Sequence, residues 1–427
     1  MGTVRFIHCA DLHLDTPFRG LSQVDEARGK ALNAATFQSL ANIVDAAIRN
    51  EVDFVVIAGD VYDSADRSVS AQFRFKRAIQ CLTDRGIDVF IACGNHDPLN
   101  GWSATIEWPK HVHTFAGDRV DIRQVTRNGN PIATLYGISY EKEATRENLA
   151  ARFPQPETDL PSIAVLHANV GGDTAHLPYA PTTVEELASK GYDYWALGHV
   201  HTHRILRAGA PAIVYPGCSQ SRHPNETGAK GCCLVTLNEA YPPDIRFIAT
   251  DIVRYDQTVL DISDCDSQDA VRQAIVGECH AIIRRSEGRH IVVRITLTGR
   301  TGLHRELTRS GSLDALLQVV REDLEGEQPW AWVERLIPDT RGSYSLEEQR
   351  GREDFVGDLV SAYDTLLDPN SGLLQERSAE LEAVLSSWQG YRFLKDPISG
   401  ETITQEEMAA LADQARRMTL DQLVEDI

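Results

Sequence analysis

Residues 53–63, DFVVIAGDVYD, decide how this chain folds, because five apolar residues in a row end abruptly at a glycine and a carboxylate. The apolar run is typical of a buried strand. Gly59 lets another segment approach closely, and the two oxygens of Asp60 can bridge two metal ions. Taken alone, Asp60 is better interpreted as a turn residue that follows a strand. The choice between these interpretations depends on whether other strands end in the same way.

The same ending, an apolar run followed by metal-binding side chains, occurs at four other places. They are Asp11 and His13 in CADLHLD, Asn95 and His96 in GNHD, His167 in LHANV, and His199 and His201 in GHVH. Each has a simpler alternative: a helix N-cap beside a surface histidine, an asparagine turn, a buried core histidine and a solvent-exposed histidine loop, respectively. We expect an extended backbone at Asp11 and His13, which would point both side chains to one side.

Strand-like runs alternate with helical patterns through the first 250 residues. Amphipathic periodicity predicts helices around 25–50 and 70–85. Short apolar runs predict strands at 4–10, 53–59, 88–94, 132–138, 162–168, 193–199, 211–217 and 231–237. The candidate ligands lie at or just past the C-terminal ends of such strands, which is the edge where α/β sheets build their sites. Together, the five segments predict a site for two divalent metal ions in a layered α/β domain.

The pattern changes near residue 250. A compact βαβαβ unit is predicted, with strands at 258–264, 289–299 and 330–337 and helices at 267–285 and 312–325. Only helices are predicted beyond it, at 346–367, 372–388 and 404–426. We therefore expect three parts, with boundaries at 1–250, 251–340 and 341–427.

Composition and charge narrow the class of protein. The chain has 427 residues, of which 42% are hydrophobic and 24% charged, as in globular proteins. No run of 18 apolar residues predicts a membrane span. The N-terminus lacks the pattern of a signal peptide, and the eight cysteines form no CxxC pair, so we expect a cytoplasmic protein. The net charge is −20, and half of it comes from residues 341–427, which have 8 Lys+Arg and 18 Asp+Glu. The negative net charge predicts weak DNA binding by the chain alone.

The series DxH, GDxxD, GNHD, H and GHxH resembles the calcineurin-like metallophosphoesterases. The resemblance implies a four-layer αββα sandwich. It implies that one metal binds Asp11, His13, Asp60 and His201, and that the other binds Asp60, Asn95, His167 and His199. It further implies that His96 donates the proton to the leaving oxygen and that the Asp63 carboxylate orients His96. Ser64 follows the GDVYD segment, where the protein phosphatases of this superfamily carry arginine, which argues against that branch.

The ligand types also suggest the metal and the reaction. Oxygen and nitrogen ligands with a carboxylate bridge favour Mn²⁺, with Fe or Zn as alternatives. Two ions about 3.5–4 Å apart activate a bridging water and stabilise both the attacking and the leaving oxygen. We therefore expect hydrolysis of a phosphate ester by water.

Longer segments resemble the SbcD/YhaO group of bacterial DNA repair exonucleases, and its YhaO branch most of all. They are CADLHLDTPFRGL, GNHDPLNGW, LHANVGG and YPGCSQSRHPNETGAKGC. The resemblance implies that the chain hydrolyses DNA as an exonuclease, with endonuclease activity in addition. It also implies a DNA-capping role for the βαβαβ unit. It also implies a partner, an SMC-like ATPase of the SbcC/YhaN kind, for which the acidic helices are a candidate docking element. A second copy of the chain is a further candidate partner.

Basic loop residues after ligand-bearing or neighbouring strands are candidate DNA contacts. They are Arg19, Arg67, Arg204, Arg222, His223 and Lys230. The alternative for each is an ordinary solvated cation.

Two other functions stay open at this point. A small-molecule phosphodiesterase or nucleotidase on the same fold would not need residues 251–427 and would cleave nucleotides faster than DNA. A non-enzymatic scaffold with an inactive site is disfavoured, because every expected ligand and His96 are present.

Overall fold

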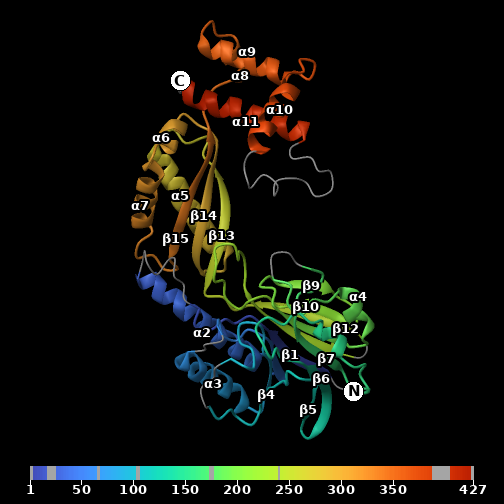
Figure 1. The fold of residues 1–427 in the computed structure, drawn as a ribbon. Helices are drawn as coiled ribbons and strands as arrows, with labels where there is room; N and C mark the ends of the chain where they lie inside the picture. The colour runs from blue at the N-terminus through green and yellow to red at the C-terminus, as the bar shows by residue number, and fades with distance from the viewer. Residues whose placement is uncertain are drawn as a thin grey trace. The chain divides into compact units, whose positions relative to one another are not determined.

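The computed structural model describes residues 3–16, 26–64, 68–101, 106–172, 177–238, 241–386 and 404–424. Within these residues it has two six-stranded mixed sheets and a further sheet of three strands (Figure 1).

The first six-stranded sheet has the order β12-β11-β1-β2-β3-β4. Its strands are β1 (Val4–Cys9), β2 (Phe54–Ala58), β3 (Asp88–Ala92), β4 (Val112–Thr114), β11 (Gly231–Asn238) and β12 (Tyr241–Ala249). The first four strands run parallel to one another. Beyond β1, β11 pairs antiparallel with β1, and β12 pairs antiparallel with β11. β2 is buried along its whole length, as expected of a parallel strand covered on both faces.

The second six-stranded sheet has the order β5-β6-β7-β8-β10-β9. Its strands are β5 (Asp121–Arg127), β6 (Asn130–Gly137), β7 (Ser162–His167), β8 (Tyr194–Gly198), β9 (Arg204–Arg207) and β10 (Ala212–Tyr215). The four inner strands run parallel, and β5 and β9 lie antiparallel at the two edges.

Three clusters of buried apolar side chains separate four layers. The inner faces of the two sheets share one cluster, in which Phe6 stacks on Phe54 and meets Tyr194 edge-on. A second cluster joins the outer face of the first sheet to α2 (Glu26–Arg49) and α3 (Val69–Thr83). A third covers the outer face of the second sheet, beneath the short helices η1 (Leu149–Arg152) and α4 (Val184–Ser189). The predicted αββα sandwich is confirmed.

Contacts divide the chain into two compact units. The first runs to Asp256 and also includes Ile282–Val292 and Gln328–Trp330. The second includes Gln257–Ala281, Val293–Glu327 and the chain from Ala331 onward. The three-stranded sheet has the order β13-β14-β15, with strands Val253–Asp261, His290–Arg300 and Ala331–Arg341, and crosses the division. Its helices are α5 (Gln268–Arg285), α6 (His304–Thr308) and α7 (Ser312–Asp323).

Helices follow the three-stranded sheet in the described C-terminal residues, as predicted, but the segment 346–367 is not one helix. It consists of α8 (Leu346–Arg350) and α9 (Phe355–Leu367), because Gly351 caps α8 and Asp354 begins α9 with its carboxylate accepting from the N–H groups of Val356 and Gly357. Two further helices follow, α10 (Leu373–Ser386) and α11 (Gln405–Leu423). The strand predicted at 258–264 was placed too late, since β13 spans Val253–Asp261.

None of the helices in the described parts of the chain combines the length and the apolar character that a bilayer crossing demands.

Candidate metal centre

The strand-end side chains come together at one edge of the sandwich. β1, β2 and β3 are neighbours in the first sheet, and β7 and β8 are neighbours in the second, so the five segments that follow them meet. Among the predicted site residues that the structure describes, three overlapping groups of potential ligand atoms result, each with its atoms within 4.8 Å of one another. They are Asp11 with His13 and His201, Asp11 with Asp60 and His167, and His13 with Asp60 and His96.

The spacing of facing atoms fits a shared cation. His13 Nε2 lies 3.2 Å from His201 Nε2, and His167 Nε2 lies 3.1 Å from Asn95 Oδ1 and 3.4 Å from Asp60 Oδ2. Two atoms that bind one ion at about 2.1 Å, with an angle of about 90–110° between them, lie about 3.0–3.4 Å apart. The measured separations fall in or next to this range.

Hydrogen bonds to the far ring nitrogens of His167 and His201 fix which nitrogen of each of these two rings faces the centre. His167 Nδ1–H donates to the carbonyl of Ala58 at 2.9 Å, so its Nε2 lone pair faces two acceptor oxygens. His201 Nδ1–H donates to Glu226 at 2.6 Å and leaves Nε2 towards His13. A lone pair that faces other acceptors, with the opposite nitrogen held by a carbonyl or carboxylate, is the arrangement of metal-binding histidines.

His199 is oriented differently from the other candidate ligands. Its Nε2–H donates to the carbonyl of Leu177 at 2.9 Å, so Nδ1 is the ring nitrogen that would bind a metal. The ring lies 5.2 Å from that of His167, centroid to centroid. Its backbone N–H donates to both carboxylate oxygens of Asp11, at 3.1 and 3.2 Å.

The backbone around the ligands is not extended, and the expectation for Asp11 and His13 is wrong in this respect. Their φ angles are 52° and 43°, and Asp60 and His199 also have positive φ, at 54° and 101°. Such conformations cost non-glycine residues of the order of 1 kcal/mol or more, and they concentrate at functional sites. Hydrogen bonds from Asp11 N to Gly59 O and from His13 N to Asp60 O, both 3.0 Å, hold the two loops together in this form.

Glycines allow the ligand loops to approach one another. A Cβ atom on Gly94 would lie 2.2 Å from Asp60 Oδ1, and one on Gly59 would lie 2.1 Å from His167 Nδ1. A Cβ atom on Gly198 would lie 1.8 Å from the carbonyl oxygen of Ala58. The glycines in GDVYD, GNHD and GHVH are therefore required by the close packing of the site itself.

The structure corrects how Asp63 orients His96. His96 Nδ1–H donates to the backbone carbonyl of Asp63 at 2.8 Å, not to its carboxylate. The Asp63 carboxylate instead pairs with Arg222 and lies 3.2 Å from His13 Nδ1. Any residue offers a carbonyl, so a sequence motif cannot distinguish the two arrangements. His96 Nε2 is left as the nitrogen that can hold a transferable proton.

Two carboxylates that organise the site were missed in the sequence. Glu226 holds His201 and also accepts from the backbone N–H of Arg222 at 2.7 Å. Asp97 accepts from the N–H of Gly94 at 2.7 Å and from that of Val61 at 2.8 Å, which ties the GNHD loop to the GDVYD loop. The final Asp of GNHD was the available signal for Asp97, whereas nothing in the local sequence marks Glu226.

Electrostatics favour a cation at this position. Burial raises the pKa of the Asp11 carboxyl well above its ordinary range, and the nearby Asp60 charge adds to the shift. Burial also lowers the pKa of His13 and His167, so neither ring supplies a positive charge. His13 Nδ1 is buried without a hydrogen bond. Oxygen and nitrogen donors in this state fit Mn²⁺, Fe or Zn.

The candidate DNA contacts differ in their placement. Arg204 and His223 are exposed. Arg222 is partly buried in the centre through its pair with Asp63. Lys230 is buried, with 4% of its surface exposed, and its Nζ donates to the carbonyl of His201 at 3.4 Å, so it is not placed to meet DNA at the surface. Arg19 and Arg67 lie outside the described residues.

Comparison with known proteins gives matches across most of the chain. The calcineurin-like phosphoesterase family matches residues 4–203, and the middle domain of metallophosphoesterase YhaO matches residues 255–341. The metallophosphoesterase YhaO of Bacillus subtilis (strain 168) is 36% identical over 362 residues, which cover 84% of this chain and 86% of the relative.

The chain is also similar to archaeal proteins described as DNA double-strand break repair protein Mre11. The protein of Sulfurisphaera tokodaii is 25% identical over 224 residues, which cover 50% of this chain and 53% of the relative. The protein of Sulfolobus acidocaldarius is 25% identical over 278 residues, which cover 61% and 66%, respectively. Since a relative of 36% identity spans most of both chains and the family match contains every predicted metal ligand, the chain belongs to the YhaO-like, calcineurin-like metallophosphoesterases, which are metal-dependent hydrolases.

Proposed function

We propose that the chain is a two-metal phosphodiesterase that hydrolyses DNA, acting as an exonuclease in DNA repair. The observation that carries the proposal is the buried cluster in which the Asp60 carboxylate lies between two groups of facing ligands. The similarity to Mre11 supports DNA as the substrate. Mn²⁺ is the proposed metal, because carboxylate, amide and imidazole donors are mixed.

We assign the metal ligands as the resemblance implies. Asp11, His13, Asp60 and His201 would hold one ion. Asp60, Asn95, His167 and His199 would hold the other. When bound, the two ions supply Lewis acidity and lower the pKa of a water to provide the nucleophile.

The remaining steps belong to side chains of the protein. His96, with Nδ1–H bound to the Asp63 carbonyl, presents Nε2 to the leaving oxygen and gives it a proton. The backbone N–H of His96 donates to Asp60 Oδ1 at 2.9 Å, so the acid and the proposed bridging carboxylate keep a fixed separation. Arg222, at the centre, and the exposed Arg204 and His223 are the candidates to hold DNA phosphates.

We also propose three parts, 1–250 as the catalytic domain, 251–340 as a capping domain that contacts DNA, and 341–427 as a helical docking region. The acidity of the last part favours a protein over DNA as its partner, and an SMC-like ATPase is the proposed one. A cytoplasmic location fits the eight cysteines, none of which forms a disulfide.

An assay with three substrates tests the proposal. Labelled double-stranded DNA, single-stranded DNA and bis-p-nitrophenyl phosphate are each offered with Mn²⁺, and with EDTA as the control. Hydrolysis of DNA with Mn²⁺ alone is the expected result. Hydrolysis of the small ester with none of either DNA would instead identify a small-molecule phosphodiesterase.

A further inference from the structure

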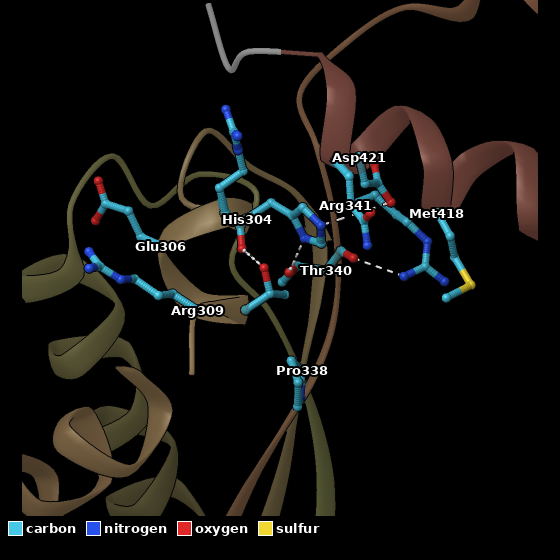
Figure 2. A pocket seen from close by; sticks show the side chains of 11 residues that line it. His304, Glu306, Arg309, Pro338, Thr340, Arg341, Met418 and Asp421 are labelled. Atoms are coloured by element: carbon cyan, nitrogen blue, oxygen red, sulfur yellow. Dashed lines mark hydrogen bonds and ion pairs between the residues drawn. The ribbon is translucent and has the colours of Figure 1, made fainter. Parts of the chain in front are cut away.

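A cavity lies within the second compact unit, between α6, the end of β15 and α11. Its volume is about 710 Å³, and we call it the arginine cavity because Arg305, Arg309 and Arg341 line it. Figure 2 shows Arg309 extending on one side of His304 and Arg341 on the other. The two guanidinium groups point away from each other, so they do not hold a single ligand between them.

In the first compact unit, by contrast, polar contacts converge on the loop of residues 218–230, between β10 and β11. Three contacts join this 218–230 loop to the metal centre. The N–H of Cys218 donates to the carbonyl of His201 at 3.1 Å, Glu226 accepts from His201 Nδ1–H at 2.6 Å, and Arg222 pairs with Asp63. The position of the loop therefore determines where the groups behind His201 lie.

Gln220, at the base of this loop, is 1% exposed and uses both ends of its amide. Its Oε1 accepts from the backbone N–H groups of Ile252 at 2.8 Å and Val253 at 3.3 Å. Its Nε2 donates to the carbonyls of Val253 at 2.6 Å and Ser221 at 3.2 Å. A side-chain amide combines an acceptor oxygen with two N–H donors, whereas a carboxylate has no donor and an ammonium group no acceptor. The site is therefore matched to glutamine.

The segment that Gln220 binds is itself firmly held. The carbonyl of Lys230 accepts from the N–H groups of Thr250 at 2.9 Å and Asp251 at 3.2 Å. The buried Asp251 carboxylate pairs with Arg254 at 2.9 Å and with Arg289 at 2.7 Å. Gln220 thus ties the 218–230 loop to a fixed stretch of backbone at the start of β13.

A short chain of contacts leads from Gln220 to the metal centre. Ser221 Oγ–H donates to the carbonyl of Glu226 at 2.7 Å, and the N–H of Arg222 donates to Glu226 Oε2 at 2.7 Å. The other oxygen of Glu226 accepts from His201. Both residues that hold Glu226 directly follow Gln220 in the chain, so a shift of Gln220 moves Glu226 and, with it, the ring of His201.

We propose that Gln220 is a positioning residue of the metal centre, which keeps Glu226 against His201 by fixing the base of the 218–230 loop. The inference rests on the proposed two-metal site and adds to it a residue that touches none of the predicted ligands. Groups that hold a metal-binding histidine from behind commonly change metal affinity by about 10–100-fold when they are altered. Because Gln220 acts one step further away, we expect an effect at the lower end of this range.

Titration of the full-length chain with Mn²⁺, followed by electron paramagnetic resonance, tests the proposal. Gln220→Glu keeps the length of the side chain and removes both donors. Its affinity for Mn²⁺ should weaken by about tenfold, with an altered spectrum of the bound ion, because the ring of His201 is displaced. A purely structural role would lower stability and leave the affinity of the folded chain unchanged. Wild-type affinity in folded Gln220→Glu therefore overturns the proposal.

The matched control is Asn50→Asp, which makes the same change from amide to carboxylate. Asn50 is half-buried, and its amide donates to the carbonyl of Ala46 at 2.8 Å. It precedes β2, whereas the ligand Asp60 follows that strand, so this variant should keep the affinity and the spectrum of the wild type. If Gln220→Glu fails to fold by circular dichroism, Gln220→Met, which is uncharged and of similar length, replaces it under the same criteria.

Combination with Glu226→Gln decides whether Gln220 acts through Glu226. In the Glu226→Gln chain, the change at Gln220 should weaken Mn²⁺ binding by less than about threefold, because the contact on which it depends is already altered. A full tenfold loss in that chain would contradict the proposed route. A wild-type chain that binds no Mn²⁺ would overturn both this proposal and the proposed function. Wild-type Mn²⁺ binding without hydrolysis of DNA would count against the proposed substrate alone.

Discussion

The metal centre and the arginine cavity are built from opposite kinds of residue. At the metal centre, Asp11, His13, Asp60 and His167 are all buried, and the rings of His167, His199 and His201 are each held by a hydrogen bond to a carbonyl or carboxylate. At the cavity, Arg305 lies on a helix of five residues and Arg309 directly follows that helix, and both are exposed. The comparison teaches that charged side chains form a site where buried loops make them face one another, as at the edge of the two sheets, and not where they diverge on the surface. Variants of the buried metal ligands should therefore affect metal binding, chemistry and stability together.

The largest effect is expected from Asp60→Asn. An amide cannot supply the charge or the second acceptor that a bridging carboxylate gives, so the metal content measured by mass spectrometry should fall and hydrolysis should drop by more than about 10⁴-fold. The control is Asp84→Asn, which changes an exposed carboxylate at the end of α3. This variant should retain both the metal content and the rate of hydrolysis. A variant that keeps two ions per chain and full activity would show that Asp60 is not shared.

His96→Ala should separate proton donation from metal binding. DNA hydrolysis should fall by about 10²–10³-fold, while metal content is unchanged, because the Asp60 side chain and the other ligands are untouched. Bis-p-nitrophenyl phosphate should be affected less, since its leaving group needs little protonation. Equal losses on both substrates would contradict the role of His96 as the acid.

Glu226→Gln tests the support behind His201. The pKa of Glu226 is held at about 2 because, against the cost of burial, the hydrogen bond and charge of His201 and the charge of Arg222 favour the carboxylate. A carboxylate whose pKa is lower in the folded protein than in the unfolded chain stabilises the fold at pH values above its ordinary pKa. This stabilisation is lost as the pH falls towards 2. Metal affinity at pH 7 should weaken by about 10–100-fold, with Glu185→Gln as an exposed control. The same affinity in both variants would remove Glu226 from the centre.

Gly94→Ala has the smallest expected effect and concerns stability. The new methyl group would meet Asp60 Oδ1 at 2.2 Å, and relieving that overlap should cost about 1–3 kcal/mol of unfolding free energy in denaturant titrations. Gly277→Ala is the matched control, because it lies inside α5 with nothing within 4 Å of the added atom, and should stabilise by up to about 1 kcal/mol. If both glycines tolerate alanine equally, the close packing of the metal loops does not limit the fold.

The two regions also differ in how far the sequence predicts them. Continuous apolar runs such as FVVIA are buried on both faces, and they predict both the strand and the polar loop that follows it. Edge strands such as β5 and β9 were not predicted, because they are mostly exposed and carry little periodic signal. The break between α8 and α9 was missed, since it depends on a capping pattern at Gly351 and Asp354 that lies inside an otherwise helical stretch.

Within the site, residue types were predictable and their geometry was not. The motifs locate Asp60, His96 and His167, because His167 ends a strand and the other two lie in loops that directly follow strands. The role of the Asp63 carbonyl and the positive φ of Asp11 depend on hydrogen bonds between loops that are distant in sequence. Glu226 reaches His201 across 25 residues, and the arginine cavity depends on α6 and α11, which are more than 90 residues apart.

The central claim is that the strand-end side chains hold two metal ions on either side of Asp60. Anomalous diffraction from crystals of the chain grown with Mn²⁺ measures this directly. We predict two peaks, about 3.5–4 Å apart, that both contact the Asp60 carboxylate. A single peak, or peaks away from Asp60, would contradict the account.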